Sequence, residues 1–272
     1  METLEVKERR LHDALRGCGR LIVAYSGGVD SAYLARAAFE ALGPEMLAVT
    51  ALSESFSAND RAMAEACARK CEFPHEFIQT EELSDPNYRA NNPNRCFFCK
   101  DELFKKLDEL ALRRGFAAVA YGVNLDDRGD WRPGQRAARE HRVLTPLLDA
   151  GLGKDEIREL AHRAGLPVWD RPASACLASR IAYGVQVTPE RLEMIEKAEE
   201  SVRALGFRQF RVRHHGNLAR LEVAPEEMAL ALQPEMARRF AEIFRSLGFT
   251  YATLDLEGYR RGSLNAGAVN SG

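Results

Sequence analysis

A run of apolar residues that leads into a glycine-rich turn is the feature that most constrains the fold of this chain. Residues 21–25 (Leu-Ile-Val-Ala-Tyr) are typical of a buried strand, residues 26–31 (Ser-Gly-Gly-Val-Asp-Ser) follow directly, and a helical pattern covers 30–42. Gly27 and Gly28 let the backbone bend sharply, so that N–H groups of the turn can face one anion. The positive end of the helix dipole adds to that attraction. The segment therefore predicts a phosphate-binding turn between a strand and a helix.

The turn lacks the lysine of the Walker A loop, G-x-x-x-x-G-K-[ST], so it belongs to another class of phosphate-binding loop. Ser-Gly-Gly-x-Asp-Ser after a strand resembles the pyrophosphatase loop of the ATP-pyrophosphatase superfamily. Members of that superfamily cleave ATP between the α and β phosphates and transfer AMP to a carbonyl or carboxylate oxygen. A glycine-rich turn that binds nothing is the alternative, but a match over the whole motif between a strand and a helix favours nucleotide binding.

Short apolar strands alternate with amphipathic helices through the first part of the chain, which predicts an α/β fold with a doubly wound parallel sheet. We expect strands at residues 20–25, 46–51, 75–79 and 117–121, and helices at 3–17, 30–42, 58–71, 97–114 and 154–164. In such sheets, ligands bind at the carboxyl ends of the strands. Polar loops leave these ends at residues 26–31, 52–58 and 122–136, so we expect the site there.

The pattern changes after about residue 180 and predicts a smaller α+β domain. Thr188 and Pro189 are typical of a helix start, and apolar residues continue at helical spacing to Leu205. Strands at 207–213 and 218–223 joined by a hairpin turn at 214–217, a helix at 234–247 and a strand at 251–256 complete an α-β-β-α-β unit. We therefore expect an ATP-pyrophosphatase domain over residues 1–180 and a substrate-binding or oligomerisation domain over residues 181–272.

Composition and charge argue against several classes of protein. The chain has 272 residues, of which 46% are hydrophobic and 29% charged, with a net charge of −2. It has no apolar run near the roughly 18 residues that cross a bilayer and no apolar signal segment, so we expect a cytoplasmic protein without a membrane partner. The near-neutral charge argues against a large nucleic-acid interface. Cytoplasmic cysteines stay reduced, so the 6 cysteines suggest metal binding, catalysis or packing.

Three of the cysteines have the spacing or the neighbours of metal ligands. Cys96 and Cys99 form a C-x-x-C pair at the start of a predicted helix, where two thiolates can reach one metal ion. Cys176 lies among small residues between Arg171 and Arg180, and nearby cations favour the thiolate, which attacks carbon or binds metal. Three thiolates suit an iron–sulfur cluster that keeps one iron open to an external ligand. Zinc with a fourth ligand, a redox dithiol and plain packing are the alternatives.

The other cysteines and two adjacent histidines have simpler interpretations. Cys67 and Cys71 are four residues apart on a predicted helix with small apolar neighbours, which favours a core face over a chelating pair. Cys18 ends the first helix and is expected to pack. His214 and His215 fall in the expected hairpin turn, where they are either solvated or help to bind an anion.

Several motifs occur in an order that is similar to one family. They are the segments at residues 26–31, 129–134 (Gly-Asp-Trp-Arg-Pro-Gly), 173–180 around Cys176, 210–213, 253–256 and 258–260. Together they resemble the LarE-type ATP-dependent sulfur transferases, which build the nickel-pincer nucleotide of lactate racemase. The resemblance runs from about residue 5 to residue 265. The loop at 26–31 is shared by many relatives, whereas the segments at 129–134 and 173–180 are more specific.

The resemblance implies a reaction in stages. ATP adenylylates a carboxylate of pyridinium-3,5-biscarboxylic acid mononucleotide and releases pyrophosphate. A sulfur nucleophile then displaces AMP and leaves a thiocarboxylate, which is one arm of the future nickel ligand. Activation by ATP is chemically sensible, because a carboxylate oxygen is a poor leaving group and AMP is a much better one.

The same resemblance implies roles for the residues of the first domain. The ATP phosphates would be held by Ser26, Gly27, Gly28, Asp30 and Ser31. Asp30 and Asp127 would hold Mg²⁺, for which carboxylates are hard oxygen ligands.

A second group of residues would hold the substrate. Arg211 and Arg213 alternate along one predicted strand, so their guanidinium groups point to the same face and suit bidentate capture of a phosphate. Ser179 and Arg180 are expected nearby. Glu199 matches an acidic residue near the family's active site, and a solvated helix face is the alternative interpretation.

The sulfur source divides the family. Some members have a single cysteine at the position of Cys176, which gives up its own sulfur once and ends as dehydroalanine. Members with three cysteines resemble enzymes that hold a [4Fe-4S] cluster and transfer a sulfide bound to its open iron, so that turnover is catalytic. Cys96 and Cys99 place this chain with the second group, which implies a cluster held by these two thiols and Cys176 and a supply of sulfide.

Three rival functions are consistent with parts of the sequence. A tRNA thiolase predicts an RNA-binding module and a broad basic face, while this chain has a slight acidic excess. An amidating ligase similar to NAD synthetase needs ammonia and no trio of cysteines. A non-enzymatic nucleotide- or metal-binding module is the third. The resemblance also implies a homo-oligomer.

Overall fold

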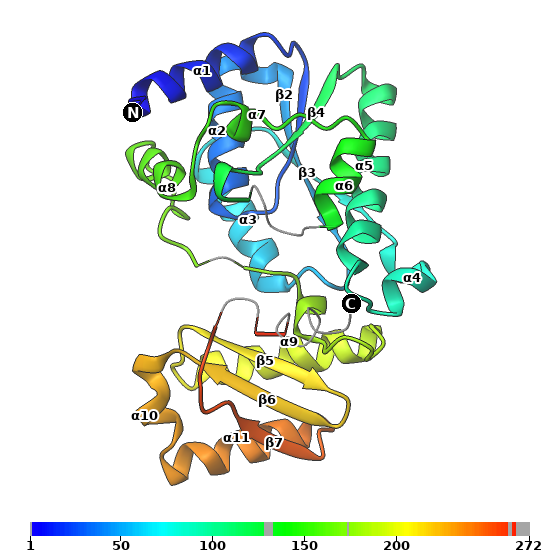
Figure 1. Ribbon diagram of the computed structural model, residues 1–272, viewed down its shortest axis with the longest axis vertical. Helices are drawn as coiled ribbons and strands as arrows, with labels where there is room; N and C mark the ends of the chain where they lie inside the picture. The colour runs from blue at the N-terminus through cyan, green and yellow to red at the C-terminus, as the bar shows by residue number, and fades with distance from the viewer. Residues whose placement is uncertain (1, 128–132, 173, 261–262, 265–272) are drawn as a thin grey trace. The chain divides into compact units, whose positions relative to one another are not determined.

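The computed structural model of the chain describes residues 2–127, 133–172, 174–260 and 263–264, which pack into two compact units (Figure 1). The first unit consists of residues 1–82 and 96–174, and the second consists of residues 83–95 and 175–272. Residues 83–95 therefore pack with the C-terminal part of the chain. Packing does not show which part folds by itself, so the domain boundary expected at residue 180 stays a prediction.

A parallel four-stranded sheet forms the centre of the first unit, as the sequence predicts. Its strands are β1 (Leu21–Ala24), β2 (Met46–Leu52), β3 (His75–Gln79) and β4 (Ala118–Tyr121). They are ordered β3-β2-β1-β4, and all neighbouring pairs are parallel. The chain moves outward from β1 to β3 and then returns to the other side of β1 with β4. The switch point at which such sheets bind ligands therefore lies beside β1 and β4.

Helices cover both faces of this sheet because its central strand is apolar on both sides. Leu21 and Val23 of β1 face one core, and Ile22 between them faces the other. The helices of this part of the chain are α1 (Leu4–Arg16), α2 (Val29–Leu42), α3 (Ala58–Lys70), α5 (Arg95–Arg114), α6 (Pro133–Glu140), α7 (Pro146–Asp149) and α8 (Lys154–Arg163). The first core takes residues from α1, α2, α3 and α8, and the second core takes residues from α5 and α6.

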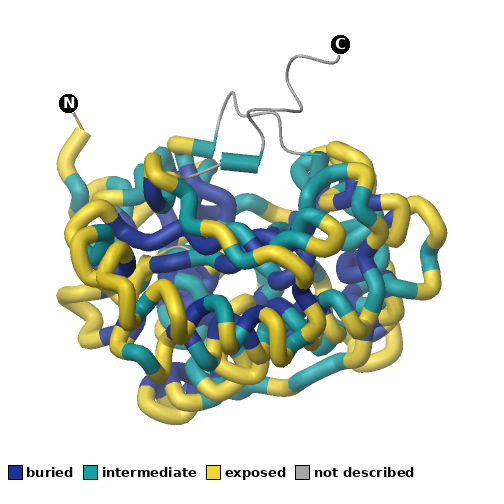
Figure 2. Tube along the Cα trace, turned by 90° about the horizontal axis from the view of Figure 1, so that it is seen from below, coloured by how far each residue is buried: buried dark blue, intermediate teal, exposed yellow. Residues whose placement is uncertain are grey.

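Cys67 and Cys71 are buried in the first core, which confirms the packing role expected for them. Buried and exposed residues alternate along the helices (Figure 2), as amphipathic helices on a core require. No helix within the described ranges is both long and apolar enough to cross a membrane.

The second unit contains a mixed three-stranded sheet ordered β5-β6-β7, which confirms the expected α+β pattern. β5 (Phe210–His215) pairs antiparallel with β6 (Leu218–Val223), and β7 (Tyr251–Leu254) pairs parallel with β6. The helices are α4 (Pro86–Arg89), α9 (Pro189–Ala204), α10 (Met228–Ala231) and α11 (Pro234–Ser246). Apolar residues of the sheet, α9 and α11 form one core.

The hairpin turn of the second unit is shorter than expected. β5 continues through His214 and His215, so residues 216–217 alone make the turn. Gly216 has a φ of 71°, the left-handed conformation that two-residue hairpin turns need. His214 is only 2% exposed and packs against Phe249. The prediction that both histidines lie in a solvated turn is therefore wrong.

Candidate functional site

The phosphate turn has the geometry that its sequence predicts. β1 ends at Ala24 and α2 begins at Val29, so the glycines lie between strand and helix. Gly27 has a φ of 73°, and a Cβ there would lie 2.9 Å from the Cβ of Ala64 in α3. Gly28 is the residue before the helix and has no side chain to cap the first-turn N–H groups. These N–H groups are therefore available to an anion at the positive end of the helix dipole.

Two serine hydroxyls close this turn. The hydroxyls of Ser26 and Ser31 are 3.1 Å apart, and Ser31 Oγ also accepts from the N–H of Ser26 at 3.2 Å and donates to the carbonyl of Gly28 at 3.0 Å. Gly122, at the carboxyl end of β4, lets the backbone of Ser31 lie close to that strand. A Cβ there would lie 2.8 Å from Ser31 N. The turn therefore sits at the predicted edge of the sheet, between β1 and β4.

Asp30 has a cationic partner that sequence reasoning missed. Lys154, the first residue of α8, donates from Nζ to Asp30 Oδ2 at 2.8 Å. Asp30 Oδ1 is buried and has no hydrogen-bond partner among the described residues. An unsatisfied buried acceptor costs about 1–3 kcal/mol, and a magnesium ion would satisfy it. The site therefore fits Asp30 as a metal ligand, with Lys154 as the cation that the loop itself lacks.

Asp127 lies on a neighbouring loop. Its Oδ2 accepts from the N–H of Asn124 at 3.2 Å, within a 3₁₀ turn over Leu125–Asp127. The preceding Asp126 accepts from the backbone N–H of Lys154, which ties this loop to the start of α8. The joint binding of Mg²⁺ by Asp30 and Asp127 stays a prediction.

Arg171 is a second cation beside the phosphate turn, and the sequence alone did not place it there. Its guanidinium pairs with Asp60 in the first turn of α3 and lies 3.5 Å from the carbonyl oxygen of Gly27. Ser174 donates to the other oxygen of Asp60 at 3.1 Å. One carboxylate, that of Asp60, thus binds both Arg171 and Ser174 beside the phosphate turn.

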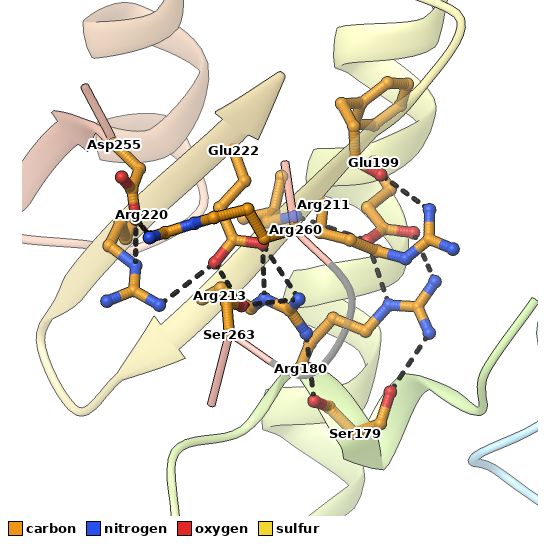
Figure 3. A network of polar contacts seen from close by, with 12 residues as sticks. Ser179, Arg180, Glu199, Arg211, Arg213, Arg220, Glu222, Asp255, Arg260 and Ser263 are labelled. Atoms are coloured by element: carbon orange, nitrogen blue, oxygen red, sulfur yellow. Dashed lines mark hydrogen bonds and ion pairs between the residues drawn. The ribbon is translucent and has the colours of Figure 1, made fainter. Parts of the chain in front are cut away.

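A buried ion pair in the second unit joins Arg180 and Glu199 (Figure 3). Arg180 Nε and Nη2 donate to the two carboxylate oxygens of Glu199 at 3.0 and 3.1 Å. The side chains are 4% and 8% exposed. Glu199 Oε1 also accepts from the N–H of Val212 at 3.2 Å, and Arg180 Nη1 donates to the carbonyl of Cys176 at 2.9 Å. Glu199 therefore positions Arg180 and is not on a solvated helix face.

Glu222 holds a second group of donors on the polar face of the sheet (Figure 3). Arg213 donates from Nε and Nη2 to Glu222 Oε2 at 3.0 and 2.8 Å, and from Nη1 to the carbonyl of Ser179 at 3.2 Å. Arg220 and Ser263 donate to Oε1 at 3.0 and 2.7 Å. Arg213 and Arg220 face each other across the strands, and the fully buried carboxylate of Glu222 offsets their repulsion.

Arg211 lies on the same face as Arg213, as predicted, with its guanidinium 5.2 Å from the ring centre of Tyr259. Burial lowers the pKa of Arg211, and the charge of Arg180 lowers it further. The arginines labelled in Figure 3 are Arg180, Arg211, Arg213, Arg220 and Arg260, and the acids are Glu199, Glu222 and Asp255. This surplus of guanidinium groups suits an anionic ligand.

The two histidines of β5 do not add to this positive charge. Burial lowers the pKa of His214 to about 4, with a further contribution from Arg191. Burial also lowers the pKa of His215, and the charge of Arg220 acts in the same direction. Burial and the neighbouring cations therefore favour the neutral imidazole at both positions, and the help with anion binding that the sequence suggested stays a prediction.

The three candidate metal-binding thiols fall in different units. Cys96 and Cys99 are in the first two turns of α5, and Cys176 precedes a 3₁₀ turn over Leu177–Arg180. Cys96 is exposed, and the other two are partly buried. Over the described ranges, the structure shows no group of three or more His, Cys, Asp or Glu residues that could hold a metal ion. The predicted cluster site therefore stays a prediction.

The aromatic motif before α6 is only partly visible. Residues 129–132 lie outside the described residues, while Pro133 and Gly134 begin α6. A Cβ on Gly134 would lie 2.9 Å from Lys100 Cγ and 3.4 Å from the carbonyl oxygen of Cys96. Glycine at this position thus lets α6 approach the start of α5.

The strand order and the phosphate turn define the ATP-pyrophosphatase class of α/β proteins. A glutamine-hydrolyzing GMP synthase chain of Pyrococcus horikoshii is 26% identical over 75% of this chain and 71% of its own. No family model matches the chain. An uncharacterized protein of Synechocystis sp. is 43% identical over 96% of this chain and 98% of its own. Pyridinium-3,5-bisthiocarboxylic acid mononucleotide synthase of Lactiplantibacillus plantarum is 34% identical over 97% of this chain and 96% of its own. The chain therefore belongs to the LarE-like family of ATP-pyrophosphatases.

Proposed function

We propose that this protein is an ATP-dependent sulfur transferase that converts carboxylates of pyridinium-3,5-biscarboxylic acid mononucleotide to thiocarboxylates for a nickel-pincer cofactor. The observation that carries the proposal is the likeness over nearly the whole chain to pyridinium-3,5-bisthiocarboxylic acid mononucleotide synthase. The phosphate turn and the arginine-rich face of the second unit support it, because the reaction needs a site for a nucleotide and a site for an anionic substrate.

In the first step, a substrate carboxylate oxygen attacks the α-phosphorus of ATP, and pyrophosphate leaves with the electron pair of the broken P–O bond. The N–H groups after Gly28 and the hydroxyls of Ser26 and Ser31 would bind the phosphates. Asp30 would take Mg²⁺ on its unsatisfied oxygen, and Lys154 would turn from Asp30 to a phosphate oxygen. The N–H groups and hydroxyls of the turn would act as fixed donors that, together with Lys154, stabilise the charge that develops on pyrophosphate.

In the second step, a sulfur nucleophile attacks the carbonyl carbon of the acyl-adenylate, and AMP leaves with the electron pair of the C–O bond. Arg211 and Arg213 would bind the substrate phosphate, with Ser179 and Arg180 beside them. Glu199 and Glu222 act indirectly, because they hold Arg180 and Arg213 in place. Fixed guanidinium groups lose little freedom on binding and therefore favour a tight, oriented complex.

Two sulfur sources are open to this chain. Cys176 can give up its own sulfur and end as dehydroalanine. The pattern of Cys96, Cys99 and Cys176 favours a [4Fe-4S] cluster, which would supply sulfide from its open iron. Thiolates are the right donors, but the described structure does not assemble them, so we derive no step through a cluster. Iron and sulfide analysis of anaerobically purified protein shows whether a cluster is bound. The intact mass of the chain after turnover shows whether Cys176 is consumed, because its sacrifice would remove H₂S from the chain.

The function itself is tested with ATP, Mg²⁺, sulfide and the pyridinium dicarboxylate. We expect AMP, pyrophosphate and a product in which sulfur has replaced oxygen, all detected by mass spectrometry. Cys176→Ala should stop thiocarboxylate formation, and Cys18→Ala should not. An amide product formed from ammonia, or ATP-dependent turnover that is unaffected by Cys176→Ala, would indicate a ligase. Sulfur transfer to tRNA and not to the dicarboxylate would indicate a thiolase.

A further inference from the structure

The guanidinium of Arg171 has more hydrogen-bond donors beside the phosphate turn than the folded chain uses. Its Nη2 donates to Asp60 Oδ1, and its Nη1 lies 3.5 Å from the carbonyl oxygen of Gly27. These contacts use two of the five N–H donors of a guanidinium, and the other three have no partner among the described residues. The side chain is only 16% exposed. Mostly buried donors that remain available favour an anionic ligand at this place.

Asp60 holds Arg171 beside the turn and leaves these donors available. The other carboxylate oxygen of Asp60, Oδ2, accepts from the hydroxyls of Ser57 and Ser174 at 2.8 and 3.1 Å. Oδ1 is therefore the oxygen that contacts the guanidinium. Arg171 can give its other donors to a phosphate while it keeps the pair with Asp60, so no ion pair has to be broken.

The backbone of Arg171 is fastened to α8. Arg158 of that helix donates from Nη1 to the carbonyl of Trp169 at 2.9 Å and from Nη2 to the carbonyl of Arg171 at 2.8 Å. The Trp169 ring packs against His162, with the ring centres 4.4 Å apart. α8 shares the first core with α2, the helix that follows the phosphate turn. The position of Arg171 is thus fixed by the same packing that fixes the turn.

The turn therefore has one cation at Gly27 and another at Asp30. Arg171 is the first, and Lys154, the first residue of α8, is the second. Both cations are held by carboxylates within the first unit. A helix N-terminus offers roughly half a unit of positive charge, which offsets only part of the charge of a polyphosphate. Two cations next to the N–H groups of the turn supply the rest of the attraction.

We propose that Arg171 is a further phosphate-binding residue of the nucleotide site and contacts the polyphosphate of ATP together with the turn and Lys154. This role rests on the proposed binding of ATP at the turn, and it does not depend on the acceptor of AMP or on the source of sulfur. A planar guanidinium matches two phosphate oxygens at once, so the contact adds orientation as well as charge.

Binding measurements test this proposal without enzyme turnover. Calorimetry with Arg171→Met is made for ATP with Mg²⁺, for pyrophosphate and for adenosine. Loss of hydrogen bonds to a charged group should raise the dissociation constants of ATP and pyrophosphate roughly tenfold to a hundredfold. Adenosine carries no phosphate, so its binding should not change. Arg171→Lys keeps the charge without the planar fork and should bind ATP with intermediate affinity.

A matched control and one structural measurement separate direct contact from a general disturbance. Arg163 is half exposed and pairs with Glu159 at 2.8 Å on α8, so Arg163→Met should bind ATP like the wild type. Hydrogen exchange of the peptide that covers residues 26–31 should be the same in Arg171→Met and in the wild type without ligand. Faster exchange there, or weaker adenosine binding, would mean that Arg171 only supports the turn, and the proposal would be wrong.

A second variant keeps the test decisive if Arg171→Met does not fold. Arg171→Met/Asp60→Asn removes both charges of the pair and keeps an acceptor for Ser57 and Ser174. Removal of the Asp60 charge reduces repulsion of an anion, so weaker ATP binding by this variant must come from the loss of Arg171.

The remaining outcomes separate this proposal from the proposed function. Equal ATP affinity of Arg171→Met and the wild type, or no ATP binding by the wild type, would reject the role of Arg171. If the expected binding pattern is observed but the wild type transfers no sulfur to the pyridinium dicarboxylate, the proposed function is wrong and the role of Arg171 remains.

Discussion

Removing one partner of the Arg180–Glu199 pair should destabilise the second unit more than removing both charges. The pair is bidentate, and the two side chains are only 4% and 8% exposed. A charge left alone in such a place costs about 3–5 kcal/mol. Arg180→Met leaves the carboxylate of Glu199 buried with the N–H of Val212 as a remaining donor, so we expect a loss within that range.

The second charge is removed by Glu199→Gln, which keeps an acceptor for the N–H of Val212. The double variant Arg180→Met/Glu199→Gln has no buried charge at this place, and its loss should fall short of the sum of the single losses by about 2 kcal/mol. The two units need not unfold together, so a single midpoint is not informative. Hydrogen exchange of peptides from α9 and β5, read by mass spectrometry as a function of urea, measures the local free energy of unfolding.

A matched control lies on the same helix. Lys197 pairs with Glu193 at 2.6 Å, but both side chains are more than half exposed, so Lys197→Met should leave the exchange of these peptides unchanged. Strictly additive losses in the Arg180 and Glu199 cycle would refute the reasoning.

The cycle also separates positioning from catalysis. If Glu199 only positions Arg180, Glu199→Gln should lower the rate equally at every pH, whereas loss of one limb of the pH profile would reveal an acid or base.

Three further predictions concern single side chains. Gly27→Ala adds a Cβ at a left-handed φ and against Ala64, so it should abolish ATP binding in calorimetry and lower the free energy of unfolding by about 1 kcal/mol or more. The control Gly19→Ala changes a residue with a φ of 66° and no neighbour within 4 Å, and it should bind ATP normally. Lys154→Met should raise the KM for ATP about tenfold in a pyrophosphate-release assay, since a hydrogen bond to a charged group is lost, and an unchanged KM would contradict its role. Burial lowers the pKa of His214 to about 4, against 6.5 for an ordinary imidazole, so between these pH values the unfolded chain binds more protons than the folded chain. The free energy of unfolding should therefore fall as the pH drops from 6.5 towards 4. His214→Phe should flatten this dependence in thermal unfolding, and an unaltered slope would show that another group causes it.

The strand, turn and helix around the phosphate site could be predicted because their determinants are local. An apolar run, two adjacent glycines and a helical period lie within about twenty residues, and the helix expected at 30–42 is observed at Val29–Leu42. Lys154 and Arg171 could not be predicted in the same way. They reach the turn from 124 and 144 residues away, and only the folded sheet brings them there.

The error at His214 and His215 has a different origin. Two polar residues before Gly216 and Asn217 suggest a four-residue turn if polarity alone is considered. The alternation of β5 argues otherwise, because Phe210, Val212 and His214 share one face and all three are buried. The strand period continues through a residue that is polar by composition but packs as an aromatic ring. Periodicity was therefore the better guide to where this strand ends.

The two proposed anion sites differ in how their carboxylates are satisfied, and we expect this difference to affect ligand binding. Asp30 has one paired oxygen and one buried oxygen without a partner in the described chain, so we expect its arrangement to change if a metal ion binds. Glu222 accepts on both oxygens, from Arg213, Arg220 and Ser263, and needs no rearrangement. Mg²⁺ should therefore strengthen nucleotide binding and leave binding of the pyridinium mononucleotide unchanged. Calorimetry of each ligand with and without Mg²⁺ measures this, and an equal effect on both would show that the metal acts outside the Asp30 site.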